Sequence, residues 1–65
     1  MYKNNVKKFR KERGMRLIDL AEKSCISAGY LCHLEKGSRA NPSREVMENI
    51  SLALNKSIAE VFFEE

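Results

Sequence analysis

Apolar residues recur at helical spacing along most of the chain, separated by short polar or glycine-containing breaks. One buried face with the spacing i, i+3, i+4, i+7 is formed by Leu17, Leu20, Ala21 and Ser24. A second periodic run follows residues 25–27, in which Leu31 and Leu34 are three residues apart. We identify five such helical segments and no strand, so the pattern predicts an all-α protein.

Two of the predicted helices flank a three-residue turn. They cover about Leu17 to Ser24 and about Ala28 to Lys36. Ser27 is placed to cap the second of them, because its hydroxyl can accept a hydrogen bond from an otherwise unpaired backbone N–H. Ala21 is small and allows another helix to cross closely. A helix, a short turn and a helix form the unit that places its second helix in the major groove of DNA.

The remaining helices are delimited by caps. The first begins at Asn4 or Asn5, either of which can cap it, and runs to Arg13, where Gly14 stops it. Gly37 ends the third helix in the same way.

Two more helices follow the Asn-Pro turn at residues 41–42, which disfavours helix before it. Ser43 caps the fourth helix and Asn55 ends it. Ser57 and Glu60 have the spacing of a capping box and open a short fifth helix. The expected core collects the inward positions of all five helices: Val6, Phe9, Leu20, Ala21, Ile26, Leu31, Leu34, Val46, Ile50, Leu54, Ile58 and Phe62.

The composition is that of one small folded domain. The chain has 65 residues, of which 43% are hydrophobic and 32% charged. We therefore expect a single domain over residues 1–65, with its core between about 6 and 63. No apolar run approaches the roughly 20 residues of a membrane span, and the lysine-rich start lacks the apolar stretch of a signal peptide. We expect no membrane association.

Cysteine and histidine usage indicates neither a metal site nor catalysis. Cys25, Cys32 and His33 do not have the spacing of zinc ligands. We expect free thiols, which imply a reducing, cytoplasmic location, and we expect no cofactor. A single histidine without neighbouring paired carboxylates also argues against an enzyme.

The net charge of +3 is unevenly distributed. Residues 1–13 contain six Lys or Arg and one glutamate, whereas residues 45–65 contain one lysine and five glutamates. Runs of charged residues like these can simply be the solvent-exposed faces of helices. Coupled to the helix, turn and helix pattern, the basic start favours a surface that faces a polyanion.

Several residues spread over most of the chain occur at the spacing of a known sequence motif. They are Arg10, Leu20-Ala21, Ile26, Ser27, Leu31, Leu34-Glu35, Gly37, Asn41-Pro42-Ser43, Ala53-Leu54 and Ser57. From about Val6 to Phe63 the chain resembles the helix-turn-helix domain of lambdoid phage repressors and Cro, often called the XRE family. The resemblance implies a compact five-helix, lambda-repressor-like DNA-binding fold with residues 28–36 as recognition helix.

The resemblance also implies which residues read base edges. The family reads bases from the first turn of the recognition helix and from one turn later, which here are Ala28, Gly29 and His33, with Cys32 close by. Ala28 can touch a thymine methyl group, Gly29 specifies nothing, and His33 can hydrogen-bond a base. The alternative for His33 is an ordinary surface histidine. With so few polar side chains, we expect modest specificity, supported by backbone contacts and DNA shape.

Phosphate contacts are expected at the starts of the second, third and fourth helices, where free N–H groups attract anions. Relatives commonly have a glutamine at the position of Leu17, which puts that contact in doubt, and Arg16 can substitute. Tyr30 either packs beside the second helix or binds a phosphate. Lys7, Lys8 and Lys11 are expected to act by long-range attraction. The candidate backbone contacts are Arg16, Leu17, Ser27, Tyr30, Lys36, Ser38, Arg39, Asn41, Ser43 and Arg44.

Three further expectations follow from the resemblance. Arg10 and Glu35 form a buried ion pair, unless Arg10 joins the basic stripe instead. Cys25 stands where the family usually has glycine, so either this turn is mildly strained or its geometry shifts. In relatives without an added domain, dimers often form through the fifth helix and its flanks. The candidate interface is Ile58, Val61 and Phe63, although Phe63 can instead be partly buried against its own core.

We therefore predict a sequence-specific, double-stranded-DNA-binding transcriptional regulator, a repressor that acts as a homodimer on a palindromic operator. Two recognition helices about 34–36 Å apart would match half-sites one DNA turn apart. The alternative from another class is a protein-interaction module, an adaptor or antitoxin with the same fold. The weak hydrogen-bonding capacity of Ala28 and Gly29 favours that alternative, and the basic first helix disfavours it.

Overall fold

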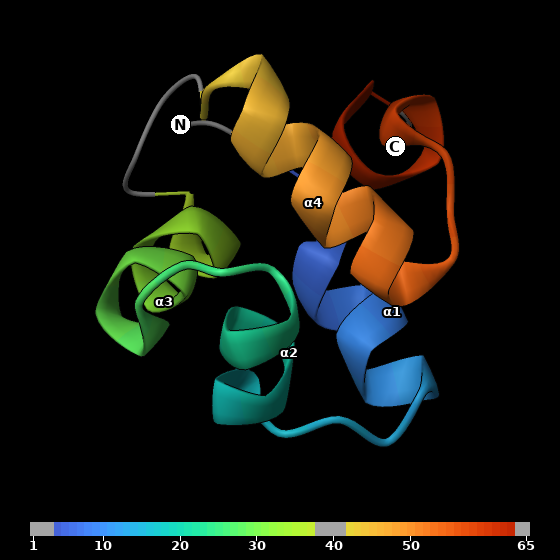
Figure 1. The fold of residues 1–65 in the computed structure, drawn as a ribbon. Coiled ribbons are helices and arrows are strands. Elements are labelled where there is room, and N and C mark those ends of the chain that lie inside the picture. Colours follow the sequence, from blue (N-terminus) through green and yellow to red (C-terminus); the bar gives the residue numbers. More distant parts are fainter. Residues whose placement is uncertain (1–3, 38–41, 64–65) are drawn as a thin grey trace.

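Four α-helices and a final π-helical turn make up the computed structural model, which describes residues 4–37 and 42–63 (Figure 1). In chain order the elements are α1 (Val6–Glu12), α2 (Leu17–Lys23), α3 (Ala28–Lys36), α4 (Arg44–Leu54) and η1 (Ala59–Phe63). α2 packs against both α3 and α4, while α1 contacts α3, α4 and η1. The predicted all-α, five-element architecture is confirmed. No helix in the described part of the chain is long and apolar enough to cross a membrane.

The helix boundaries follow from capping groups. The hydroxyl of Ser27 accepts a hydrogen bond from the backbone N–H of Tyr30 at 3.1 Å, and that of Ser43 accepts one from Val46 at 3.2 Å. Gly37 ends α3 in the left-handed conformation at φ 75°. These caps are local interactions, which is why α3 begins and ends where the sequence predicts.

The last helix opens with the expected capping box. The Ser57 hydroxyl accepts from the Glu60 N–H at 3.1 Å, and the Glu60 carboxylate accepts from the Ser57 N–H at 3.0 Å. Asn55, at φ 57°, ends α4 just before it.

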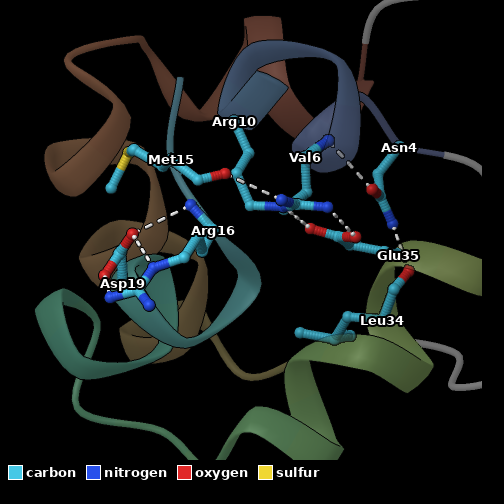
Figure 2. A network of polar contacts seen from close by, with 8 residues as sticks. All are labelled: Asn4, Val6, Arg10, Met15, Arg16, Asp19, Leu34 and Glu35. Carbon is cyan, nitrogen blue, oxygen red and sulfur yellow. Dashed lines mark hydrogen bonds and ion pairs between the residues drawn. The ribbon is translucent and has the colours of Figure 1, made fainter. Parts of the chain in front are cut away.

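Two asparagines anchor the start of α1 to distant elements. Asn4 accepts from the Val6 N–H through its Oδ1 at 3.0 Å, and its Nδ2 donates to the carbonyl of Leu34 at 2.8 Å (Figure 2). The backbone N–H of Asn5 donates to the carbonyl of Val61 at 2.7 Å, and its side-chain amide donates to the Glu60 carbonyl at 2.8 Å. The first residues before α1 therefore bind both α3 and η1.

The buried core draws on every element: Val6, Leu20, Ala21, Leu31, Leu34, Ile50, Leu54, Val61 and Phe62. Four of the predicted core residues, Phe9, Ile26, Val46 and Ile58, are only partly buried but pack against it. Val61 is fully buried, so the prediction that it contributes to a dimer surface is wrong. In a π-helical turn the hydrogen-bonding step is one residue longer than in an α-helix, which changes which positions of η1 face inward.

Candidate nucleic-acid interface

The outer face of α3 is exposed to solvent. Leu31 and Leu34 are completely buried, and this fixes the opposite side of the helix outward. The exposed positions Gly29, His33 and Lys36 follow one another at intervals of four and three residues, which places them on one face. We call these three residues the reading face.

The other two candidate base contacts lie on the flanks of the reading face. Ala28 is half-buried and packs against the core, as does Tyr30, which accords with the packing alternative for that tyrosine. Cys32 is half-buried as well. Of the four residues predicted to contact bases, only Gly29 and His33 are fully on the exposed side.

An ion pair between Arg10 and Glu35 fixes α3 relative to α1. The Arg10 guanidinium donates from Nε to Glu35 Oε2 at 2.6 Å and from Nη2 to Oε1 at 3.1 Å (Figure 2). The two side chains are 11% and 7% exposed. The third guanidinium nitrogen donates to the carbonyl of Met15 at 2.8 Å. Hydrogen bonding to Glu35 raises the pKa of Arg10 and outweighs the opposing effect of burial.

A hollow of about 300 Å³ lies where α1, the start of α2 and the end of α3 meet; its lining residues are Lys7, Arg10, Leu17, Cys32, Glu35 and Lys36. Arg10 and Glu35 neutralise each other at this hollow. Within residues 4–37 and 42–63, Lys7 and Lys36 form no ion pair. We call this the lysine hollow.

Lys7 lines the lysine hollow, whereas the sequence indicated only long-range attraction for this residue. It lies three residues before Arg10, and residues at that spacing are neighbours on one helical face. Because Arg10 was expected to face α3, the same spacing could have brought Lys7 to this hollow.

The start of α2 offers less free positive charge than expected. Arg16 donates to Asp19 from Nε at 3.1 Å and from Nη2 at 3.0 Å, and its backbone N–H donates to the same carboxylate at 2.9 Å (Figure 2). The Arg16 hydrogen bonds lower the pKa of Asp19. Leu17 is half-buried and packs against the core. Because the Arg16 side chain is 79% exposed and uses only Nε and Nη2 for Asp19, its remaining N–H donors can still reach a phosphate, although Asp19 offsets its charge.

Two exposed serines retain a free donor at helix starts. The hydroxyl oxygens of Ser27 and Ser43 accept helix N–H groups, which leaves each O–H group able to donate to a phosphate oxygen. Arg44 is exposed and pairs with Glu48 at 3.2 Å. The candidates Ser38, Arg39 and Asn41 lie outside the described residues.

The turn between α2 and α3 is strained at Cys25. This residue has φ 60°, in the left-handed region that favours glycine, and its side chain is exposed. Of the two alternatives for the turn, the structure has the strained one. Both cysteines are free thiols.

Two of the three candidate dimer residues retain accessible surface. Phe63 is 67% exposed and Ile58 is half-buried. Leu52 on α4 is 78% exposed and lies outside the predicted core and the predicted sites. The large apolar side chains that are exposed in the described part of the chain therefore include Leu52 on α4 and Phe63 on η1, together with Ile18 on α2.

Comparison with known proteins identifies relatives over most of the chain. A family model described as Helix-turn-helix matches residues 6–61. The HTH-type transcriptional regulator SinR of Bacillus subtilis is 36% identical over 58 residues, covering 89% of this chain and 52% of SinR. The immunity repressor protein of Bacillus phage phi105 is 37% identical over 60 residues, covering 92% of this chain and 41% of the repressor. The chain thus spans about half the length of the curated relatives it matches.

Solved structures agree with this similarity. The N-terminal DNA-binding domain of SinR from Bacillus subtilis superposes with a TM-score of 0.79 at 37% identity, over 83% of this chain and 78% of that one. A structure of SinR in complex with DNA gives a TM-score of 0.79 at 37% identity, over 83% and 86% of the two chains. Each of these proteins is described as a transcriptional regulator, a DNA-binding domain or a repressor.

Proposed function

This chain belongs to the helix-turn-helix family, and on that basis we propose that it is a transcriptional regulator that binds double-stranded DNA with α3 in the major groove. We further propose that it is a repressor and acts as a homodimer on a palindromic operator in the cytoplasm. It works by binding rather than by catalysis.

The observation that carries this proposal is the arrangement around the reading face. Gly29, His33 and Lys36 are exposed on a helix that the Arg10–Glu35 pair holds in place, and Lys7 lines the same hollow as Lys36. An exposed helix face can enter the major groove, and neighbouring cations neutralise the phosphates that border it. The relatives support the same function, since a similar domain has been solved bound to DNA.

The residues divide into two roles in this proposal. His33 hydrogen-bonds a base edge, Gly29 permits close approach, and Ala28 and Cys32 contact the edge of the groove. Lys36 and Lys7 bind phosphates, and so do the hydroxyls of Ser27 and Ser43 at helix starts. Arg16 and Arg44, which are largely exposed, bind phosphates with the guanidinium N–H groups that their carboxylate partners leave free. Because phosphate contacts carry no base information, we expect modest specificity.

The test is selection of bound duplexes from a randomised pool, followed by fluorescence anisotropy on the enriched sequence at several salt concentrations. The expected result is a palindrome, with affinity that falls steeply as salt rises because counterions are released from the DNA. His33→Ala should relax the base preference at one symmetric pair of positions.

A matched variant separates base reading from general loss of binding. Lys23→Ala removes an exposed cation from α2, outside the reading face and the lysine hollow, and should leave the selected sequence unchanged. If no sequence is enriched and affinity remains weak even at low salt, DNA binding is excluded and a protein partner becomes the better hypothesis.

A further inference from the structure

His33 is the one histidine of the chain, and its exposed side chain lies on the reading face of α3, between Gly29 and Lys36. Histidine is the side chain that ordinarily gains or loses a proton between about pH 5 and 8. We propose that His33 takes up a proton when α3 enters the groove, so that mild acid strengthens binding and the protonated ring selects a base edge that presents acceptors. The inference rests on the proposed function, because it concerns the same contact with DNA.

The folded protein supplies no counter-charge that would fix a proton on His33. In the described part of the chain this imidazole forms no ion pair. α3 packs against α1 and α2, and the carboxylates on these three helices are Glu12, Asp19, Glu22 and Glu35. Glu35 is bound to Arg10 and Asp19 to Arg16. The other two carboxylates lie beyond ion-pair distance of His33.

The cations around α3 act against protonation of His33. Lys36 lies three residues further along the same helical face, and like charges at that spacing repel each other. On α1, Lys7 lines the same hollow as Lys36, whereas Glu35 neutralises Arg10 there. The last turn of α3, which contains His33, has the opposite effect, because the helix dipole favours a positive charge at the C-terminal end of a helix. The charge of His33 in the free protein is thus set by small opposing effects.

The remaining ionisable side chains of the three helices do not alter this arrangement. They are Lys8, Lys11 and Lys23, which are exposed and do not line the lysine hollow, and Tyr30 and Cys32, which are half-buried on α3. His33 is therefore the group of the reading face whose charge the surroundings of α3 can change near neutral pH.

Entry of α3 into the groove shifts the balance toward the charged imidazole. The groove is bordered by phosphates, and an opposite charge within about 4–6 Å favours the charged form of an ionisable group. Phosphates that bind Lys36 and Lys7 also neutralise the cations that oppose protonation. His33 therefore binds its proton more tightly in the complex than in the free protein. Because such coupling is reciprocal, the proton strengthens DNA binding by the same factor.

The protonated ring also reads a different base edge. A neutral imidazole has one donor and one acceptor, whereas the protonated ring has two donors and cannot accept. Guanine presents the acceptors N7 and O6 in the major groove, whereas the amino groups of adenine and cytosine require an acceptor on the protein. On the reading face, a Cβ built at Gly29 meets no atom within 4 Å, so the surface one turn before His33 is open to an approaching base. We therefore expect guanine opposite His33.

The experiment is a titration of His33 by NMR, with and without a duplex that carries one half of the selected palindrome. Since the chain has a single histidine, its ring signal is unambiguous. Addition of the duplex should move the midpoint of the titration to higher pH by about one unit, a tenfold change in proton affinity. Half-site affinity, measured by anisotropy at constant ionic strength, should rise about fivefold from pH 8 to pH 6. Both values lie above the range in which Asp19 and Glu60 lose their charge.

His33→Gln retains hydrogen-bonding groups but cannot take up a proton. Its half-site affinity should change less than about twofold between pH 8 and pH 6, and selection at the two pH values should give the same base opposite this position. Lys23→Ala, which removes an exposed cation from α2, should keep the pH dependence of the original chain. For the original chain, selection at pH 6 should enrich guanine more strongly than selection at pH 8.

The inference is overturned if the duplex leaves the titration midpoint where it was or moves it to lower pH, or if His33→Gln keeps the full pH dependence. An equal movement on a duplex that lacks the selected sequence would overturn the contact with the base edge. Failure of the proposed function gives a different result. In that case the original chain binds neither the half-site nor the palindrome at pH 6 or pH 8, even at low salt.

Discussion

Arg10 and Glu35 lie 25 residues apart in sequence and form two hydrogen bonds, at 2.6 Å and 3.1 Å, between α1 and α3. Through them the helix that carries the reading face is attached to the helix that carries Lys7. The same guanidinium also binds the Met15 carbonyl in the segment before α2. One arginine thus connects α1, the segment before α2, and α3, and aligns the surfaces proposed to meet DNA.

Removing one partner of this pair should destabilise the domain strongly. In Glu35→Ala the guanidinium of Arg10 remains buried without a counter-charge, and the free energy of unfolding should fall by about 3–5 kcal/mol. Urea unfolding followed by circular dichroism measures this. Arg16→Ala, which breaks an exposed ion pair, should have a far smaller effect. Equal losses in the two variants would contradict a structural role for the buried pair.

Adding a methyl group at Gly29 should stabilise α3. A Cβ built there has no other atom within 4 Å, so Gly29→Ala gains helix propensity of up to about 1 kcal/mol without a steric penalty. Thermal unfolding checks this. The matched change Gly37→Ala should instead lower stability, because Gly37 has φ 75°. A destabilised Gly29→Ala would show that this position needs more backbone freedom than an α-helix does.

The turn residue Cys25 should be improved by glycine. Its φ of 60° costs about 1–2 kcal/mol for a residue with a Cβ. Part of the gain is offset because glycine is more disordered in the unfolded state, so Cys25→Gly should raise stability by about 0.5–1 kcal/mol in denaturant unfolding. Cys25→Ala removes the thiol but retains the strain, so a similar gain in that variant would exclude strain as the cause.

Acid should destabilise the domain through two carboxylates that accept hydrogen bonds in the folded protein. Hydrogen bonds from Arg16 lower the pKa of Asp19, and the Ser57 backbone N–H lowers the pKa of Glu60, from ordinary values of 3.8 and 4.5. A carboxylate with a lowered native pKa stabilises the fold above its unfolded pKa, and this stabilisation is lost as the pH falls through the native pKa. The melting temperature should therefore fall below about pH 4.5. In the Asp19→Asn, Glu60→Gln double variant it should fall less steeply, and an unchanged slope would refute this origin.

Lys7 and Lys8 should differ in their effect on DNA binding. Lys7 lines the lysine hollow. The Nζ of Lys8 instead lies 5.6 Å from the ring centre of Phe9, and Lys8 is not part of that hollow. Lys7→Ala should weaken binding to all sequences and reduce the salt dependence by the equivalent of about one phosphate contact. Lys8→Ala should change both less. Anisotropy titrations at several salt concentrations measure the difference. If the salt dependence of binding is the same in the two variants, Lys7 acts only by long-range attraction.

Most of the fold could be predicted because its determinants are local. Ser27, Ser43 and Ser57 cap helices through hydrogen bonds within three residues, and a capping pattern of that length is visible in the chain itself. The same holds for Gly37 and Asn55, whose left-handed conformations end α3 and α4.

The candidate site was less predictable. The spacing of Leu31 and Leu34 was enough to turn His33 outward. It did not reveal that Ala28 and Cys32 are half-buried, because their burial comes from residues outside α3.

The sequence by itself thus determined that the protein is helical, where its helices begin and end, and which side of α3 is free, since periodicity and capping act over a few residues. Tertiary structure decided the rest. The burial of Val61, the position of Lys7 beside Lys36, and the exposure of Leu52 depend on how elements far apart in the chain pack together. The link between Asn5 and Glu60 spans 55 residues. Contacts between residues so far apart in sequence depend on how the helices pack together, and packing is a property of the whole domain.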